Sequence, residues 1–307
     1  MKISFFETTA EEKKILLSHL DGVDCDFFEV KLNEENAHLA KESDMVSVFV
    51  NSVVSKNVID NIPNLKFITT RSTGFDHIDT THTKSKGIVT SNVPAYGSRT
   101  VAEFTFALLL DLSRKISLAN KLMKEKKDCD ISSLRGFDLN GKTIGVVGTG
   151  KIGKNVVKIA KGFDMKVIAF DAFPDLNFAK ENGFEYVPLN DLLSQSDIVT
   201  LHTPYNKDTH NLIDMDRVKL FKKGSYLVNT ARGEIVDTKA LQWALEQNII
   251  AGAGLDVVHD GYELINLPQV IMTPHVAFNS NEAEAEILRV TGENILAFIA
   301  NTPKNTV

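Results

Sequence analysis

The fold is decided by the stretch Lys142-Thr-Ile-Gly-Val-Val-Gly148-Thr-Gly150-Lys-Ile-Gly153. An apolar run typical of a buried strand leads directly into the pattern Gly-x-Gly-x-x-Gly, and a helix-compatible segment follows. In such a turn the first glycine makes the bend, the second lets the backbone approach a pyrophosphate, and the third lets helix and strand pack closely. The helix N-terminus favours phosphate charge. The stretch therefore predicts a dinucleotide site rather than a glycine-rich turn without a ligand.

An acidic residue at the end of the next apolar run bears on the choice of dinucleotide. Residues 165–170 form that run and Asp171 follows it, at the distance where a carboxylate reaches the adenosine ribose. A carboxylate accepts hydrogen bonds from ribose hydroxyls but repels a 2′-phosphate. Ala172 and Phe173 come next, so no arginine stands ready for that phosphate. The sequence therefore favours NAD over NADP.

Length and composition indicate an ordinary globular chain. It has 307 residues, 43% of them hydrophobic and 24% charged, with a net charge of −6. These values suggest two domains and argue against nucleic acid or an anionic membrane as a partner. No apolar run is long enough to span a membrane. Cys25 and Cys129 are far apart and match no metal or redox spacing, so we expect a reducing, cytoplasmic location.

Short apolar runs alternate with helix-compatible segments along the chain, which predicts parallel α/β sheets. In the first third we expect strands at 3–6, 26–30, 45–50, 67–70 and 88–90 and helices at 11–20, 33–41 and 56–61. In the second series we expect strands at 143–148, 166–170, 197–201, 225–229, 253–256 and 270–273.

Two helices are expected to connect these series. Thr100 and Glu103 match a capping box, and the apolar pattern that follows continues toward Lys121, which predicts one long helix. The tail from 282 to 300 also has helical periodicity, and we expect it to return to the first domain. The predicted domains are therefore residues 1–97 with 280–307, and residues 98–279.

Two side chains that follow predicted strands suit acid–base chemistry on a carboxylic acid. Arg232 ends the motif that starts at Val228, and an arginine there can grip a carboxylate with two bonds and polarise a carbonyl. His275 follows a proline turn, and its ordinary pKa lies near neutrality, as a general acid or base requires. The alternatives are a surface arginine and a structural histidine.

Three further segments are candidates for binding. Asp256 would either bind the nicotinamide amide or hold a loop. The small residues at 72–75 follow a strand and can present backbone N–H groups to a carboxylate, and Tyr96 can add a hydroxyl. No set of side chains has the spacing of metal ligands, so we predict no metal site.

Together these segments resemble the D-isomer-specific 2-hydroxyacid dehydrogenase family over nearly the whole chain. The motifs that carry the resemblance are Ser72-Thr-Gly-Phe-Asp-His-Ile-Asp79, Asn92-Val-Pro-Ala-Tyr96 with Val101-Ala-Glu103, Gly148 to Gly153 with Asp171, Leu201-His-Thr-Pro-Tyr205, Asn229-Thr-Ala-Arg-Gly233, Gly254-Leu-Asp-Val257 and Thr273-Pro-His275. Tyr96 and Phe278 are most similar to the D-lactate dehydrogenase branch. The resemblance implies an α/β protein with two Rossmann- or flavodoxin-like parallel-sheet domains separated by a cleft.

The resemblance also implies an NAD-dependent enzyme that interconverts a 2-oxo acid and a D-2-hydroxy acid, with pyruvate and D-lactate as the first choice. Arg232 would bind the carboxylate and carbonyl oxygen, and His275 would donate or remove the proton. The implied substrate contacts are Ser72, Thr73, Gly74, Phe75, Tyr96, Arg232 and His275. The implied cofactor contacts are Gly148, Thr149, Gly150, Lys151, Ile152, Gly153, Asp171, His202, Thr203, Pro204, Thr230, Ala231, Arg232, Asp256 and His275. Such proteins are commonly homodimers, here through residues 101–127.

The chain departs from the family at one catalytic position. Members normally carry a glutamate that hydrogen-bonds the histidine and raises its pKa, whereas Gly261 occupies that place here, in a shortened loop. We expect Glu263 to replace it, in preference to Asp260, because the residues after Glu263 resemble the family's own continuation. If neither carboxylate reaches His275, reduction at neutral or higher pH would be slower.

Two other functions stay open at this point. The missing glutamate is compatible with a non-enzymatic NAD(H)-binding sensor or interaction protein on the same fold. An enzyme for another acid, such as hydroxypyruvate, glycerate or a branched 2-oxo acid, would carry the same motifs. Turnover of a 2-oxo acid would exclude the non-enzymatic alternative. Comparing specificity constants for 2-oxo acids with side chains of different size would distinguish an enzyme for another acid.

Overall fold

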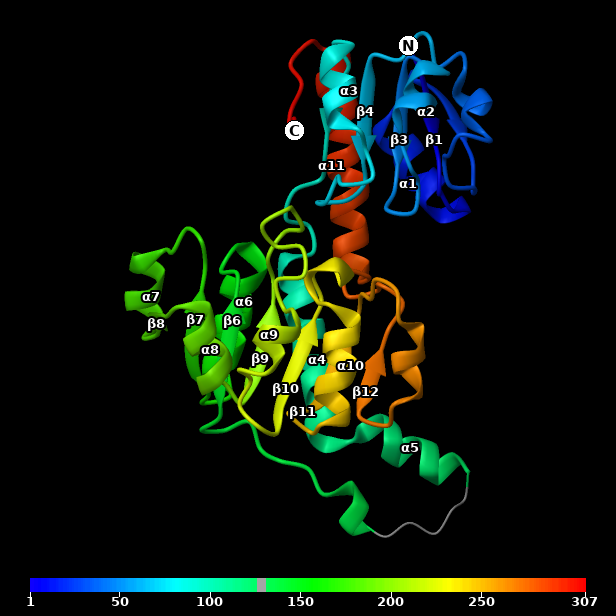
Figure 1. The fold of residues 1–307 in the computed structure, drawn as a ribbon. Helices are drawn as coiled ribbons and strands as arrows, with labels where there is room; N and C mark the ends of the chain where they lie inside the picture. The colour runs from blue at the N-terminus through cyan, green and yellow to red at the C-terminus, as the bar shows by residue number, and fades with distance from the viewer. Residues whose placement is uncertain (126–130) are drawn as a thin grey trace. The chain divides into compact units, whose positions relative to one another are not determined.

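The computed structural model of this protein describes residues 1–125 and 131–307, so Cys129 and Lys127 lie outside the described residues. The chain forms two compact units (Figure 1). The first unit contains residues 1–96 and 280–307, and the second contains residues 97–279.

The first unit is built on a five-stranded parallel sheet in the order β2-β1-β3-β4-β5, the flavodoxin-like arrangement. Its strands are β1 (Lys2–Phe5), β2 (Asp24–Phe27), β3 (Met45–Val48), β4 (Phe67–Thr70) and β5 (Val89–Ser91). Every residue of β3 and β4 is buried, as expected for parallel strands covered on both faces. The expected strands are therefore present, with ends shifted by a few residues.

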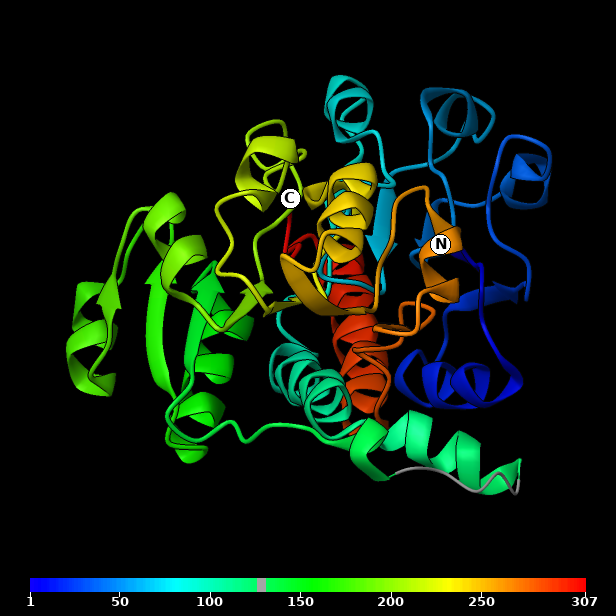
Figure 2. The ribbon, with the colours of Figure 1, turned by 60° about the horizontal axis from the view of Figure 1, so that its bottom comes forward.

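The helices of the first unit include its C-terminal segment. They are α1 (Ala10–His19), η1 (Ala37–Ala40), α2 (Lys56–Asp60), α3 (Thr80–Ser85) and α11 (Asn281–Ile299). Helix α11 packs on α1 and β4 (Figures 1 and 2). The expected helix at 33–41 is wrong, because only a short 3-10 turn forms. The Asn33 Oδ1 accepts the N–H groups of Glu35 and Asn36, and this local bonding competes with a helical start.

The second unit carries a seven-stranded parallel sheet in the order β12-β11-β10-β9-β6-β7-β8, the strand order of a dinucleotide-binding fold with one added strand. Its strands are β6 (Thr143–Val147), β7 (Lys166–Phe170), β8 (Glu185–Tyr186), β9 (Ile198–Leu201), β10 (Ser225–Asn229), β11 (Ile250–Leu255) and β12 (Val270–Met272). Its helices are α4 (Ser98–Arg114), α5 (Ile116–Lys124), η2 (Ile131–Leu134), α6 (Lys151–Gly162), α7 (Leu176–Asn182), α8 (Leu189–Gln195), α9 (Met215–Val218), η3 (Gly233–Ile235), α10 (Thr238–Glu246) and η4 (Tyr262–Asn266).

The long connecting helix differs from the prediction in two ways. It begins at Ser98, so Thr100 lies inside the first turn, and Glu103 pairs with Arg99 rather than closing a capping box. It ends at Arg114, because Lys115 adopts the left-handed conformation with φ 53°. Helix α5 then starts anew, and the periodicity toward Lys121 belongs to two helices.

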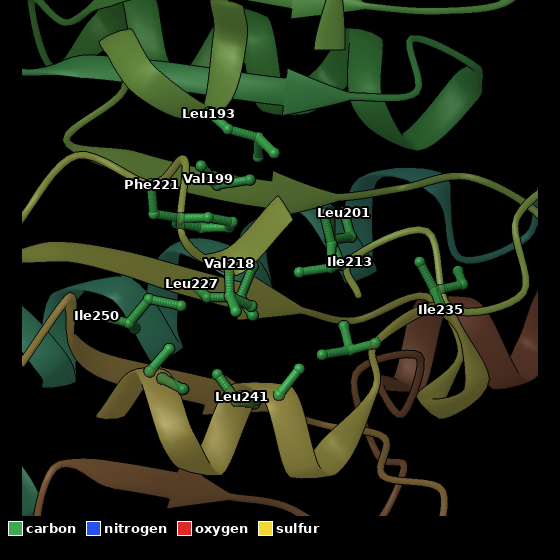
Figure 3. Packing of buried hydrophobic residues seen from close by; sticks show 14 of the residues in the cluster. Leu193, Val199, Leu201, Ile213, Val218, Phe221, Leu227, Ile235, Leu241 and Ile250 are labelled. Carbon is green, nitrogen blue, oxygen red and sulfur yellow. The ribbon is translucent and has the colours of Figure 1, made fainter. Parts of the chain in front are cut away.

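The core of the second unit has two layers, one on each face of the sheet. Successive residues of a strand point to opposite faces, so Leu227 joins one cluster and Val228 the other. Helices α8, α9 and α10 cover the first face with residues such as Leu193, Val218 and Leu241 (Figure 3), and α4 and α6 cover the second. This packing holds the carboxyl ends of the strands in fixed positions, where the predicted site residues of the second unit lie.

Within residues 1–125 and 131–307, no helix has the length and apolar character needed to cross a membrane. The same residues contain no group of three or more His, Cys, Asp or Glu side chains arranged to hold a metal ion.

Candidate active site

The glycine loop after β6 is shaped by close backbone contacts. Gly148 has φ 92°, and a Cβ added there would lie 2.8 Å from the carbonyl carbon of His202. A Cβ on Gly153 would lie 2.0 Å from the carbonyl oxygen of Gly148. Both positions therefore require glycine. A Cβ on Gly150 would meet no atom of the described part of the chain within 4 Å, so packing there does not explain that glycine, whereas the approach of a ligand does.

The N-terminus of α6 has the properties of an anion site. Its N-cap is Gly150, and no side chain caps it. The N–H groups of Lys151, Ile152 and Gly153 have no acceptor among the described residues. Because such groups and the helix dipole together attract negative charge, the pyrophosphate of a dinucleotide fits this end of the helix.

Asp171 lies at the end of β7 and is tied to the glycine loop. Its Oδ2 accepts the N–H of Thr149 at 2.6 Å and the Thr149 hydroxyl at 3.0 Å, while its Oδ1 accepts the N–H of Phe173 at 2.9 Å. A carboxylate offers about four lone-pair positions, so Oδ1 retains the capacity to accept a ribose hydroxyl. The negative charge stands next to the loop, where it would repel a 2′-phosphate.

Two buried polar atoms lie at the adjoining strand end. Strands β6 and β9 are neighbours at the point where the strand order reverses, which is where ligands bind in such sheets. The His202 Nε2 is bonded to the Thr200 hydroxyl, but His202 Nδ1 and Thr203 Oγ1 are buried with no hydrogen-bond partner among residues 1–125 and 131–307. Burial lowers the pKa of His202 to about 3, so its ring is neutral at physiological pH. Unpaired buried polar atoms beside the glycine loop fit a bound cofactor.

The remaining predicted cofactor contacts lie in the loops after β9 and β10. Pro204 is exposed, Ala231 is half-buried and Thr230 is buried. The Thr230 hydroxyl bonds to that of Thr105 on α4 at 3.0 Å. The residues present therefore fit a dinucleotide at the carboxyl edge of this sheet.

Arg232, Asp256 and His275 follow three neighbouring strands, β10, β11 and β12. Because the carboxyl ends of parallel strands meet at one edge, the three side chains come together although they are far apart in sequence. The Arg232 Nη1 donates to the carbonyl oxygen of Ala231 at 2.8 Å, and Arg232 and His275 are both half-buried.

Asp256 holds the loop that carries the histidine. Asp256 as a whole is 1% exposed, and its carboxylate accepts hydrogen bonds from Thr273 Oγ1 at 2.5 Å, Val276 N–H at 2.9 Å and Ala277 N–H at 2.9 Å. Its carbonyl oxygen accepts the N–H of His275 at 2.9 Å. Of the two roles considered for Asp256, the structure therefore supports holding a loop.

His275 itself has an unusual backbone and environment. Its φ is 56°, a strained conformation for a non-glycine residue. The hydrogen bonds between Asp256 and residues 275–277 hold the backbone in this conformation. Burial, and then the positive charge of Arg232, lower the pKa of His275 below its ordinary value, against the opposing charge of Asp256. The imidazole is therefore a weaker base than a free histidine.

The structure does not bring the expected carboxylates to His275. Glu263 is exposed on η4, and the Asp260 side chain is 96% exposed and lies 3.8 Å from His259. No hydrogen bond or ion pair links the imidazole of His275 to any described residue. The carboxylate whose negative charge opposes the lowering of the His275 pKa is that of Asp256.

The loop at 72–75 in the first unit has the hydrogen-bonding pattern of an anion site. Its carbonyl groups are used internally: Ser72 O accepts from Val93 N, and Thr73 O accepts from the Asn92 side chain at 2.7 Å. Gly74 O accepts from Ser72 Oγ at 2.6 Å. The N–H groups of Thr73, Gly74 and Phe75 have no acceptor among the described residues. Tyr96 is half-buried and follows Ala95, whose N–H bonds Thr73 Oγ1 at 3.3 Å.

Some supporting residues are not apparent from the sequence. Tyr186 on the edge strand β8 bonds to the hydroxyl of Thr149 in the glycine loop at 2.8 Å. Thr105 on α4 positions the hydroxyl of Thr230. Of the residues that support the site, Thr273 has a recognisable signal in the sequence, since it begins the motif Thr273-Pro-His275.

Comparisons with known proteins agree on one family. Residues 106–277 match the family model "D-isomer specific 2-hydroxyacid dehydrogenase, NAD binding domain". A glyoxylate reductase of Korarchaeum cryptofilum is 35% identical over 84% of this chain and 80% of that protein. The apo D-lactate dehydrogenase of Escherichia coli superposes with TM-score 0.90 at 33% identity over 100% of both chains. The Aquifex aeolicus D-lactate dehydrogenase, complexed with NAD and lactic acid, gives TM-score 0.89 at 33% identity over 98% of this chain and 96% of that one.

Proposed function

This chain belongs to the NAD-dependent D-isomer-specific 2-hydroxyacid dehydrogenase family, and from that premise we propose that it reduces pyruvate to D-lactate. The observation that carries the proposal is the juxtaposition of Arg232 and His275, close enough for the guanidinium charge to lower the pKa of the imidazole. D-Lactate dehydrogenases and glyoxylate reductases are both similar to this chain. Pyruvate is our choice because Tyr96 and Phe278 resemble the D-lactate branch.

The proposed chemistry assigns each residue a task. NADH, when bound, supplies the hydride that is added to the C2 carbon of the 2-oxo acid. Arg232 binds the carboxylate with its planar guanidinium and stabilises negative charge on the carbonyl oxygen. The imidazolium of His275 gives its proton to that oxygen, which becomes the hydroxyl group, and the neutral imidazole removes it in the reverse direction.

The substrate and the cofactor are held by separate groups of residues in this proposal. The N–H groups of Thr73, Gly74 and Phe75, which lack protein acceptors, and the Tyr96 hydroxyl hold the substrate carboxylate. The N-terminus of α6 holds the pyrophosphate and Asp171 the adenosine ribose. The other proposed cofactor contacts are Thr149, His202, Thr203, Pro204, Thr230 and Ala231, and Asp256 acts through the loop that it holds.

The test is the oxidation of NADH by the purified protein with a panel of pyruvate, glyoxylate, hydroxypyruvate and 2-oxoisocaproate. We expect the highest kcat/KM with pyruvate, and chiral analysis should identify the product as D-lactate. A higher kcat/KM with another panel member would replace pyruvate by that acid. A lactate product of L configuration would overturn the proposed D-lactate dehydrogenase activity.

A specific observation favours a second function. Gly261 stands where the family glutamate is expected, so a protein that binds NAD(H) without turnover is the alternative. It predicts that NADH fluorescence changes on binding while no panel acid is reduced, whereas turnover with any of them excludes it.

We also propose a cytoplasmic homodimer. Helix α5 has no buried residue and exposes Ile116 (57%) and Met123 (71%) on its amphipathic surface, which an apolar contact with a second copy would cover. Replacing both residues by glutamate should convert dimer to monomer in sedimentation velocity, and Lys121→Glu on the same helix is the matched control. A wild-type protein that sediments as a monomer would disprove the dimer.

A further inference from the structure

A chain of hydrogen bonds runs through the first unit toward the loop at 72–75. The His77 Nε2 lies 3.1 Å from the Thr70 hydroxyl, which lies 2.6 Å from the Ser72 hydroxyl, and Ser72 Oγ lies 2.6 Å from the carbonyl oxygen of Gly74. Thr70 ends strand β4 and is 0% exposed, and Ser72 is 2% exposed. The bond between the Thr70 and Ser72 hydroxyls is therefore shielded from water and stronger than a similar bond at the surface, while His77 and Gly74 at the two ends are half-buried.

The direction of donation along this chain is determined by its last member. A carbonyl oxygen only accepts, so the single hydroxyl hydrogen of Ser72 goes to Gly74 O. The Ser72 oxygen must then accept from Thr70, whose own hydrogen is thereby used. Thr70 must in turn accept from His77, so Nε2 of His77 carries a hydrogen. Both the Nε2–H tautomer and the imidazolium meet this requirement.

The end of the chain fixes the orientation of one peptide group. In a trans peptide the carbonyl and the following N–H point in opposite directions. Holding Gly74 O inward therefore turns the N–H of Phe75 outward, and no described residue accepts it. The loop at 92–93 orients the two preceding peptides in the same way, through Val93 N and the Asn92 side chain. Only the third peptide depends on Ser72.

We propose that His77 is a positioning residue for substrate, which acts through Thr70 and Ser72 to aim the Phe75 N–H at the carboxylate of the 2-oxo acid. This inference rests on the proposed function of the loop at 72–75. His77 does not touch the substrate. Without its donor, Thr70 and Ser72 can reorient their hydroxyl hydrogens, and the Gly74–Phe75 peptide is then free to turn.

The experiment compares His77→Leu, which removes the donor, with His77→Gln, whose side-chain amide supplies one. Pyruvate kinetics at saturating NADH should give a KM raised about 10-fold or more in His77→Leu, since a hydrogen bond to a charged group contributes roughly this factor. The kcat and the dissociation constant of NADH should stay within about 2-fold of the wild-type values, because the hydrogen bonds from His77 to Gly74 lie in the first unit and the glycine loop lies in the second. His77→Gln should recover most of the loss, and His38→Leu, at an exposed histidine of the same unit, is the control.

A double-mutant cycle separates positioning from general stability. Because His77 and Ser72 act in series, His77→Leu combined with Ser72→Ala should raise KM no more than Ser72→Ala alone. Additive effects, or a KM unchanged in His77→Leu, would overturn the inference. If His77→Leu does not fold, Thr70→Val interrupts the same chain and makes the same prediction. A wild-type protein that reduces no 2-oxo acid would instead remove the proposed function, and this inference with it.

Discussion

Gly261 and Thr238 are in such close contact that a Cβ added to Gly261 would lie 2.1 Å from Thr238 Cγ2. Gly261 also has φ 102°, a backbone conformation that side chains other than glycine rarely adopt. The position where the resemblance places a glutamate is therefore closed to a side chain by both packing and backbone. A carboxylate partner for His275 therefore cannot be supplied at position 261 by a simple exchange, because Thr238 and the positive φ both require glycine there.

This contact makes a prediction about stability. Gly261→Ala should lower the free energy of unfolding by about 2–4 kcal/mol, from backbone strain and overpacking together. Adding Thr238→Ser removes the methyl group but keeps the hydroxyl that donates to His259 O at 2.8 Å, and should recover the overpacking part. Gly22→Ala is the control, because Gly22 has φ 76° but nothing within 4 Å of an added Cβ. Urea unfolding measures all four proteins, and equal losses in Gly261→Ala and Gly22→Ala would refute the steric account.

The depressed pKa of His275 predicts the pH dependence of the reaction. Reduction needs the imidazolium, so kcat/KM for the 2-oxo acid should fall about 10-fold per pH unit above a midpoint below 6.5. Oxidation of the hydroxy acid needs the neutral imidazole and should rise through the same midpoint. Initial rates in both directions from pH 5 to 9 provide the measurement, and a midpoint above 6.5 would contradict the arrangement described.

Glu263 supplies the companion test. The structure leaves its carboxylate exposed on η4 and away from His275, so Glu263→Gln should not move the midpoint, and Asp260→Asn should behave in the same way. A midpoint that falls in Glu263→Gln but not in Asp260→Asn would show that the loop at 257–265 rearranges during turnover. In that case Glu263 would replace the family glutamate.

The sheets could be predicted from the sequence because buried parallel strands appear as short apolar runs. Strand β4 occupies Phe67–Thr70, the residues expected. Strand β8 was missed because two residues at a sheet edge, Glu185 and Tyr186, carry no pattern. Helix boundaries were less predictable. The break at Lys115 interrupts a pattern that otherwise looks continuous, and no glycine or proline marks it.

The candidate site was predictable where a motif determines the backbone, as in the loop from Gly148 to Gly153. The parts of the site in which a side chain has several possible hydrogen-bond partners were not predictable. The role of Asp256 depends on the loop at 273–277, which is distant in sequence. The place of Glu263 depends on how the loop at 257–265 closes around Gly261, and the sequence of that loop does not determine which way the Glu263 side chain points.

Asp171 predicts the cofactor preference. Asp171→Ser should lower the ratio of kcat/KM for NADH to that for NADPH at least 10-fold, because removing the charge ends the repulsion of the 2′-phosphate. Part of the loss with NADH should come from the Thr149 N–H, which would lose its acceptor. Asp191→Asn, an exposed acid of the same unit, is the control. An unchanged ratio would mean that Asp171 does not face the ribose.

His202 makes the last prediction, on acid stability. Its pKa is about 3 in the folded protein because of burial, against an ordinary 6.5. Between pH 6.5 and 3 the imidazole is protonated in the unfolded chain but neutral in the folded one. This group therefore lowers the free energy of unfolding as the pH falls through that range. The full effect is on the order of 5 kcal/mol, or about 1.4 kcal/mol per pH unit. Urea unfolding without cofactor measures the free energy of unfolding of wild type and of His202→Gln. The difference, wild type minus variant, should decrease with that slope as the pH falls. His210→Gln, at an exposed histidine, is the control, and a flat difference for His202→Gln would mean that the buried ring becomes protonated in the folded state.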